Sequence, residues 1–336
     1  MARITYGLAT SHGPMLSIPP EYWIDRVSAD RENPQHFYQG KTYTFDQLVE
    51  HLRPRDLPAQ ITADVCRERY ERCQAAVREL ADFFESNRPD VALIVGNDQM
   101  EVFNRDHVPA FAVFWGEYVE GHPRTPEFLA KLNRGVARAE ADRTPPVYTQ
   151  YPCVPALGRH LIQAVIADGF DVSQLTHLPV GEIGVNSAPH AYGFVYRRIM
   201  RDKVVPHVPV FVNTFYPPNQ PPAGRCFEFG RALARAIASW PEDWKVAVIG
   251  SGGMTHFVVD EEFDREVLDG LRKCEERFFS DLSEKMFQSG TSEIKNWIAV
   301  AGAMAEAGLS MSLVDYVPCY RSEAGTGSAM GFARWC

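Results

Sequence analysis

Short runs of wholly apolar residues, each followed by a polar or glycine-containing turn, constrain the fold of this chain most strongly. Residues 91–95 read Val-Ala-Leu-Ile-Val, and similar runs occupy residues 208–212 and 246–249. A strand without polar residues must be buried on both faces, which is the usual state of strands in a parallel sheet. Further strands are predicted at residues 4–9 and 111–115.

Helical patterns separate these strands. Apolar residues recur at spacings of three and four between residues 63 and 86, which predicts one amphipathic helix that ends before Pro89. Other helices are predicted near residues 126–139, 155–168, 226–239, 261–288 and 293–307. Because strands and helices alternate for most of the length, the fold class is α/β, with a central, largely parallel sheet flanked by helices.

The chain is expected to form one catalytic domain over residues 1–336. This length exceeds the usual size of a single core, but α/β proteins often remain one elaborated domain. Residues 15–60 are rich in proline, aromatic and charged residues, and long segments of this kind in compact domains are often functional. We interpret them as a cover loop over the active site. Residues 261–336 are expected to form a helical C-terminal part.

The net charge of −9 argues against a nucleic-acid surface, which needs a clustered basic face. No apolar run is long enough to span a bilayer, and residues 1–8 lack the features of a secretory signal. Seven cysteines are scattered without a Cys-x-x-Cys pair, which is typical of reduced thiols in a cytosolic chain. We therefore expect a cytoplasmic protein with a small-molecule partner and with no nucleic-acid or membrane partner.

Histidines follow two of the predicted strands. His12 comes after residues 4–9, and His256 ends a glycine-rich turn, residues 250–256, that follows the strand at 246–249. Open α/β sheets bind ligands at their carboxyl edge, so both imidazoles are expected there. Glycines leave room for a substrate beside His256, which is the best candidate for a catalytic base. For either residue, the alternative is a loop histidine with a structural role.

Glu293 stands at the start of the last predicted helix, after a Gly-Thr-Ser sequence that can cap it. One interpretation is structural, because the helix dipole favours a carboxylate at a helix N-terminus. The other is chemical, because two histidines and a carboxylate on one side of a metal form the facial triad of Fe(II) enzymes that use oxygen. His12 and Glu293 supply two members of such a triad, and the pattern leaves the third open.

Five segments, in this order along the chain, resemble the class III extradiol ring-cleavage dioxygenases, the group that contains the catalytic subunit of protocatechuate 4,5-dioxygenase. They are residues 10–14 (Thr-Ser-His-Gly-Pro), 93–98 (Leu-Ile-Val-Gly-Asn-Asp), 216–218 (Tyr-Pro-Pro) with 225–226 (Arg-Cys), 250–256, and 292–297 (Ser-Glu-Ile-Lys-Asn-Trp). Residues 97–99 and 320–327 are most similar to the 3-O-methylgallate dioxygenases. The resemblance implies this family's α/β fold, Fe(II) as the cofactor, and a catechol or gallate-type aromatic substrate that is cleaved with O2.

The resemblance also implies roles for individual residues. His12 and Glu293 become iron ligands, and His256 becomes the acid/base residue. Tyr216 and Ser187 are expected next to the substrate. A homodimer is expected by analogy with the family.

Two positions depart from the family's pattern. Gln99 stands where most members have the second histidine ligand, and Ser187 stands where many have a second catalytic histidine. An amide oxygen is a harder and weaker ligand than imidazole. For the first departure, three explanations stay open: Gln99 binds the iron directly, another histidine such as His51 replaces it, or iron catalysis is lost. For the second, His190 is a candidate for the missing catalytic acid, and a structural role is its alternative.

The implied reaction is the insertion of O2 into an aromatic ring next to its paired hydroxyl groups, in the breakdown of aromatic, lignin-derived compounds. A carboxylated substrate calls for an arginine that can bind it through two hydrogen bonds. The candidates are Arg197, Arg198, Arg225 and Arg321. Two alternatives stay open: a metal-dependent hydrolase or other non-oxygenase with the same pocket, and a catalytically impaired homologue that binds a metal or ligand.

Overall fold

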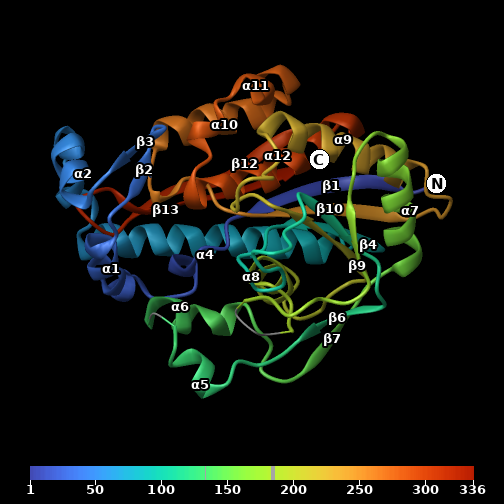
Figure 1. The fold of residues 1–336 in the computed structure, drawn as a ribbon, viewed down its shortest axis with the longest axis horizontal. Helices are drawn as coiled ribbons and strands as arrows, with labels where there is room; N and C mark the ends of the chain where they lie inside the picture. Colours follow the sequence, from blue (N-terminus) through green and yellow to red (C-terminus); the bar gives the residue numbers. More distant parts are fainter. Residues whose placement is uncertain (133, 183–185) are drawn as a thin grey trace.

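The computed structural model describes residues 1–132, 134–182 and 186–336 of the chain. Within these residues, a nine-stranded sheet has the strand order β11-β13-β1-β10-β4-β9-β5-β8, with β12 paired to β13. Helices cover both faces of this sheet (Figure 1). The α/β class and the central sheet flanked by helices are therefore confirmed.

The strands of the large sheet are β1 (Arg3–Thr10), β4 (Val91–Gly96), β5 (Phe111–Phe114), β8 (Ser173–Leu175), β9 (His207–Val212), β10 (Lys245–Ser251), β11 (His256–Val258), β12 (Met311–Tyr320) and β13 (Thr326–Trp335). Two separate two-stranded sheets pair β2 (His36–Tyr38) with β3 (Lys41–Tyr43) and β6 (Tyr118–Gly121) with β7 (Thr149–Pro152).

The α-helices of the described residues are α1 (Val27–Glu32), α2 (Phe45–Leu52), α3 (Leu57–Gln60), α4 (Ala63–Ser86), α5 (Pro126–Leu129), α6 (Arg134–Ala139), α7 (Pro155–Ala167), α8 (His190–Phe194), α9 (Ala223–Ala238), α10 (Glu261–Lys273), α11 (Glu276–Asp281) and α12 (Ile294–Ala307). Short 3-10 helices that matter for the site are η2 (Pro20–Arg26), η4 (Glu140–Asp142) and η7 (Ser289–Glu293).

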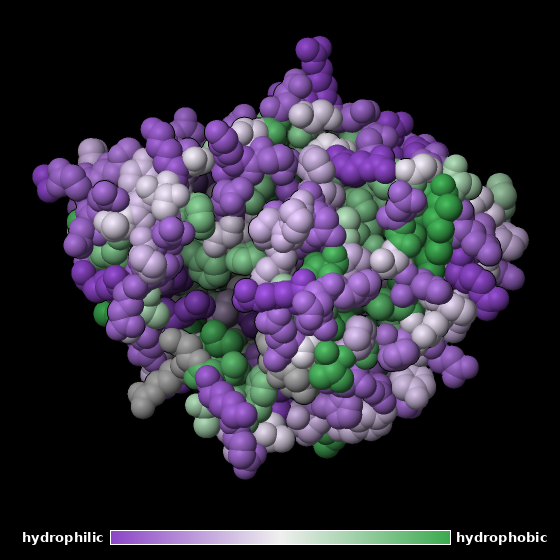
Figure 2. All heavy atoms as spheres, viewed as in Figure 1, coloured by the Kyte–Doolittle hydropathy of each residue, from purple (hydrophilic) through white to green (hydrophobic). Residues whose placement is uncertain are grey.

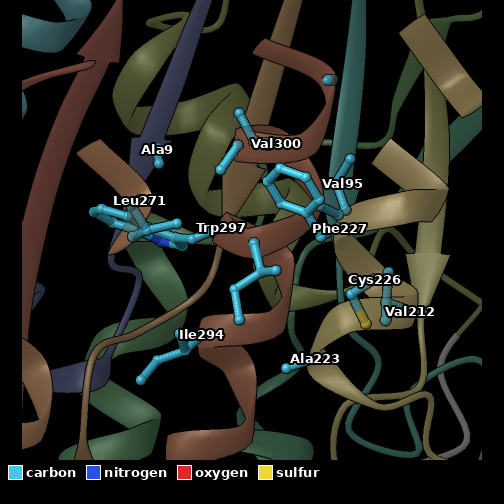
Figure 3. Packing of buried hydrophobic residues seen from close by; sticks show 14 of the residues in the cluster. Ala9, Val95, Val212, Ala223, Cys226, Phe227, Leu271, Ile294, Trp297 and Val300 are labelled. Atoms are coloured by element: carbon cyan, nitrogen blue, oxygen red, sulfur yellow. The ribbon is translucent and has the colours of Figure 1, made fainter. Parts of the chain in front are cut away.

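The apolar runs of the sequence form the parallel centre of the sheet. β1 pairs with β10, β10 with β4, and β4 with β9, all in parallel. Successive residues of β4 alternate between two core clusters: Val95 packs in the cluster that contains Phe227 of α9 and Val300 of α12 (Figure 3), whereas Ile94 packs in the cluster that contains α4. Both faces of these strands are thus buried, which explains why neither face is polar.

The C-terminal part differs from the expectation. Helices α10, α11 and α12 account for much of residues 261–307, but the helical prediction for the remainder is wrong, because β12 and β13 form a long antiparallel hairpin there. β13 also pairs with β1 and β11, and nearly all of its residues are buried. A strand buried between two neighbours carries no polar alternation, so its glycine-, serine- and alanine-rich sequence showed neither a strand nor a helix period.

Residues 15–60 form short helices and the β2–β3 hairpin. Of this segment, Arg26 at the end of η2 lines a cavity at the ends of the parallel strands. Its role as a cover, and the single catalytic domain, stay predictions. No helix in the described part of the chain is both long enough and apolar enough to cross a membrane.

Candidate metal centre and active site

A cavity of about 260 Å³ lies where the parallel strands end. Figure 2, drawn in the same orientation as Figure 1, shows a hollow in the surface near α6 and α8. The apolar side chains that line the cavity are Phe128, Leu132, Val136, Phe215 and Phe257. The polar side chains that line it include His12, Arg26, Gln99, Glu101, Arg124, Glu140, Arg143, His190, His256 and Glu293.

The start of α12 is bonded to the ends of two parallel strands. Asn296 donates from Nδ2 to the backbone oxygen of Ser251 (2.8 Å), the last residue of β10, and to Oδ1 of Asn97 (2.9 Å), which follows β4. Trp297 donates from its indole nitrogen to the backbone oxygen of Gly252 (3.2 Å). These bonds hold Glu293, the last residue of η7, against the carboxyl edge of the sheet.

His12 presents an unpaired ring nitrogen at this edge. Its Nδ1 lies 2.9 Å from the Ser251 hydroxyl, which itself donates to the backbone oxygen of Ala191 (2.6 Å). The hydroxyl oxygen must therefore accept a hydrogen from Nδ1, and in a neutral ring the lone pair is left on Nε2. Burial lowers the pKa of His12 to about 4, so the ring is neutral near pH 7. Among the described residues, Nε2 has no hydrogen-bond partner.

Glu293 is a buried carboxylate that is held as an anion. Oε1 accepts hydrogen bonds from Asn97 Nδ2 (3.1 Å) and Gln99 Nε2 (3.2 Å). Oε2 lies 3.2 Å from His12 Nε2 and 3.6 Å from His256 Nε2. Burial raises the pKa of Glu293, but the two histidines outweigh burial and hold this pKa well below its usual value.

His190 completes a group of three side chains. Its Nδ1 lies 2.5 Å from Oε2 of Glu101, and its backbone N–H donates to the same carboxylate (3.0 Å to Oε1). Burial lowers the pKa of His190, but Glu101 outweighs burial and the net shift is upward. The ring stands edge-on to His12, with 4.7 Å between the ring centroids. His12, His190 and Glu293 each offer one potential ligand atom, and these three atoms lie within 4.8 Å of one another.

His256 is held by its neighbours with one nitrogen free. Its Nδ1 lies 2.7 Å from the backbone oxygen of Met254, so Nδ1 carries the hydrogen and Nε2 faces Glu293. A Cβ at Gly290 would lie 2.2 Å from the ring, and a Cβ at Gly253 would lie 2.7 Å from it. Only glycine fits at these two positions. For Gly253, the glycine-rich turn in the sequence already indicates this. Burial lowers the pKa of His256, but Glu293 outweighs burial and the net shift is upward.

Gln99 and Tyr216 lie beside this group. Gln99 donates to Glu293 and accepts at Oε1 from the Tyr216 hydroxyl (3.3 Å). Its amide nitrogen thus faces the carboxylate, an orientation assigned from the hydrogen-bond pattern. Direct ligation by Gln99 stays a prediction, and so does contact of Tyr216 with a substrate.

Two other residues lie outside the cavity lining. Ser187 is buried, and its hydroxyl accepts from the backbone N–H of His122 (3.0 Å). His51 is exposed and packs against Tyr38 and Tyr43. The structure does not bring His51 to the candidate metal centre.

Several residues that line the cavity were not predicted from the sequence. Glu101, Arg143 and Phe128 line the cavity but belong to no predicted strand end. The sequence does carry a signal for Glu101, because this residue lies two residues after Gln99, in the loop that follows the predicted strand at residues 91–95. The sequence gives no comparable signal for Arg143, which reaches the cavity from the end of η4 and donates to the backbone oxygen of His12 (3.0 Å).

The fold and the site define an α/β protein with a buried group of two histidines and one carboxylate beside an aromatic-lined cavity. Residues 63–327 match the family described as the catalytic LigB subunit of aromatic ring-opening dioxygenase. Because this match covers most of the chain, the chain belongs to that family.

Two individual proteins show narrower similarity. A gallate dioxygenase of Pseudomonas putida is 31% identical over 163 residues, which is 45% of this chain and 45% of the relative. The match thus spans less than half of the relative's length. The crystal structure of an uncharacterized protein from Escherichia coli K12 has 16% identity and a TM-score of 0.45, covering 76% of this chain and 91% of that one.

Proposed function

We propose that this protein is an Fe(II)-dependent extradiol dioxygenase that inserts O2 into the ring of a catechol or gallate-type substrate. The observation that carries the proposal is the buried group of His12, His190 and Glu293 beside the cavity of a ring-opening dioxygenase family member. Two histidines and one carboxylate are the donor set of non-haem Fe(II) oxygenases.

The three side chains fit a divalent cation. The lone pair of His12 Nε2 and the Oε2 atom of Glu293 face each other at 3.2 Å, and the described residues place no proton donor between them. Two facing acceptors in a buried site repel each other unless a cation lies between them. The Nδ1 atoms of His12 and His190 are bonded to Ser251 and Glu101, which fixes both rings and leaves Nε2 for a metal.

In this proposal, His190 takes the ligand position for which the sequence offered Gln99. Gln99 then acts as a positioning residue, because it orients Glu293 through one hydrogen bond and accepts another from Tyr216. Ser187 does not line the cavity and takes no substrate-binding role in this proposal, because its hydroxyl accepts a hydrogen bond from the backbone N–H of His122.

Bound Fe(II) supplies the redox and Lewis-acid chemistry that joins O2 to an aromatic diol. The protein supplies proton transfer. His256 donates a hydrogen bond from Nδ1–H to the backbone oxygen of Met254, which leaves the lone pair on Nε2. Nε2 can therefore accept the proton of a substrate hydroxyl. Glu293, 3.6 Å away, stabilises the imidazolium that results. The same nitrogen can return the proton later in the reaction.

The cavity wall suits an aromatic substrate. Phe215 and Phe257 line it beside the polar group, and Phe128 lines the same cavity from α5. Such a wall offers a flat ring apolar contact and excludes water from the site of proton transfer. O2 and one small aromatic molecule are therefore the proposed partners.

Metal analysis and oxygen uptake test this function together. Protein purified without air should contain iron, consume O2 with a gallate-type catechol, and form a yellow ring-opened product. His256→Ala is the control, because it should keep the iron and lose the oxygen uptake. Tightly bound zinc with no oxygen uptake on any catechol would favour the hydrolase alternative and overturn the proposal.

A further inference from the structure

Among the described residues, three arginines line the cavity, and two of them form no ion pair. Arg124 forms an ion pair with Glu140, with 2.7 Å between Nε and Oε2. In the part of the chain that the structure describes, Arg26 and Arg143 form no ion pair, although both line the same cavity. A guanidinium taken out of water without a counter-charge is unfavourable, so these groups call for an anion.

Arg143 is the more buried of the two. Its side chain makes one hydrogen bond, from Nη2 to the backbone oxygen of His12, and its Nε has no partner among the described residues. The residue is only 6% exposed. Burial lowers the pKa of Arg143 even though Glu140 and Glu101 act in the opposite direction. The protein therefore holds an incompletely bonded guanidinium beside the backbone of a proposed metal ligand.

Arg26 is half-buried, and its side chain makes no hydrogen bond to any described residue. Asp30, the acid whose charge acts on Arg26, is already engaged, because Arg321 donates to both of its carboxylate oxygens (2.7 Å each) and Thr326 donates a third bond (2.7 Å). The neighbouring Asp25 pairs with Arg138. Burial, together with the charges of Arg321 and Arg143, lowers the pKa of Arg26 to about 10. Arg26 is thus free to bind something other than the protein.

The carboxylates of the cavity are all bonded. Glu101 is bonded to His190, Glu140 to Arg124, and Glu293 to Asn97 and Gln99. Among the described residues, the unused hydrogen-bonding groups of these charged side chains therefore lie on the guanidinium groups of Arg26 and Arg143.

Resting on the function proposed above, we infer that Arg26 and Arg143 bind the carboxylate of a catechol carboxylic acid. The substrate's diol lies toward His12 and Glu293, and its acid group lies toward the two guanidinium groups. Charged hydrogen bonds to guanidinium are among the strongest in binding sites and fix the orientation of a planar acid.

The arginines that the sequence offered for this role are used elsewhere. Arg225 donates to the backbone oxygen of Gly169 (2.8 Å) and stacks on Phe170. Arg197 pairs with Asp202, Arg198 with Asp142, and Arg321 with Asp30. None of the four belongs to the cavity lining.

Two matched ligands test the inference. 3,4,5-Trihydroxybenzoate and its uncharged amide share the ring and the three hydroxyl groups, and differ in the negative charge. Calorimetry without O2 should show tighter binding of the acid by the intact protein. Arg26→Gln and Arg143→Gln should each weaken acid binding by about tenfold to a hundredfold, with little change for the amide.

Arg225→Gln is the control and should bind both ligands as the parent does. Arg143→Lys keeps the charge and should recover part of the preference for the acid. If Arg143→Gln does not fold, the partly exposed Arg26→Gln still decides the test. An unchanged preference for the acid in every variant that folds would overturn the inference.

Turnover separates this inference from the proposed function. If Arg26→Gln no longer cleaves the ring of the acid but still cleaves the ring of the amide, both the proposed function and the carboxylate site are supported. A parent protein that cleaves neither compound but binds the acid through these arginines contradicts the proposed function and leaves the carboxylate site intact. Equal cleavage of acid and amide by parent and variants contradicts the carboxylate site alone.

Discussion

Two buried carboxylates flank the same glycine-rich turn and have opposite electrostatic characters. Asp264 of α10 is bonded by the Thr255 backbone N–H (2.8 Å), the Thr255 hydroxyl (2.6 Å) and the Tyr316 hydroxyl (2.7 Å). Burial raises the pKa of Asp264 to about 7. Glu293 meets two imidazoles and two amides instead, and its pKa lies well below the usual value.

The difference shows that burial alone does not identify a functional acid. Asp264 has neutral donors that also suit a protonated acid, so it can fasten α10 and β12 to Thr255 without holding a charge. Glu293 faces the unpaired nitrogen of His12 and is held as an anion. An ionised acid beside an unpaired imidazole is suited to bind a cation.

The largest effect is expected from removing the charge of Glu293. Glu293→Gln keeps the shape but not the anion, so iron binding should weaken by more than about a hundredfold, with no detectable ring cleavage. Asp264→Asn keeps the shape of the other acid and should leave iron binding unchanged. Iron content after dialysis under argon, together with oxygen uptake, measures both variants. Equal iron in the two variants would remove the distinction between the acids.

The next largest effect is expected at His256. Loss of a general base costs about 10² to 10⁴-fold in rate, so His256→Ala should lose turnover by that factor and keep its iron. In the parent, a base works when it is unprotonated, and the pKa of His256 is raised by Glu293 despite the opposing effect of burial. The rate should therefore rise with pH through a value above the usual histidine pKa. Iron loss in His256→Ala would show that this residue is a ligand instead.

A smaller effect is expected at Gln99. Gln99→Leu removes the bonds to Glu293 and Tyr216, and loss of a residue that orients a ligand costs about tenfold in metal affinity. Fe(II) titration without air measures it. Gln99→His is the companion variant: tighter iron binding there would place position 99 among the ligands, against the positioning role.

The smallest effect on activity is expected for Asp264→Asn, whose consequence is a change in the pH dependence of stability. Since folding raises the pKa of Asp264 from 3.8 to about 7, the folded state binds its proton more tightly than the unfolded state. This carboxyl group therefore contributes to the free energy of unfolding, and its contribution is fully present below about pH 4. As the pH rises toward 7, the contribution falls by up to about 1.4 kcal/mol per pH unit. Urea unfolding from pH 4 to 8 should show a flatter profile in the variant. Parallel profiles would contradict the assigned pKa.

The sequence predicted the parallel centre of the sheet well, because a fully apolar run such as residues 91–95 has few alternatives to a strand buried on both faces. The helix over residues 63–86 was predicted for a similar reason, from one continuous apolar stripe. The β12–β13 hairpin was missed, because pairing with β1 decides its structure more than local preference does.

The same distinction applies to the site. His12 and Glu293 each adjoin a recognisable strand or helix end, so their meeting could be predicted from the topology. The pairs formed by Glu101 with His190 and by Arg143 with the His12 backbone join segments far apart in the chain. Their meeting depends on how α8 and η4 pack, which no local pattern reports.

The most direct test of this account is the iron content of His190→Ala. The parent protein, reconstituted with Fe(II) under argon and desalted, should hold about one iron per chain, as one facial triad requires. If His12, His190 and Glu293 bind the metal, His190→Ala should retain little of it, whereas Gln99→Ala should retain most. Full iron in His190→Ala together with loss in Gln99→Ala would contradict the proposed metal centre.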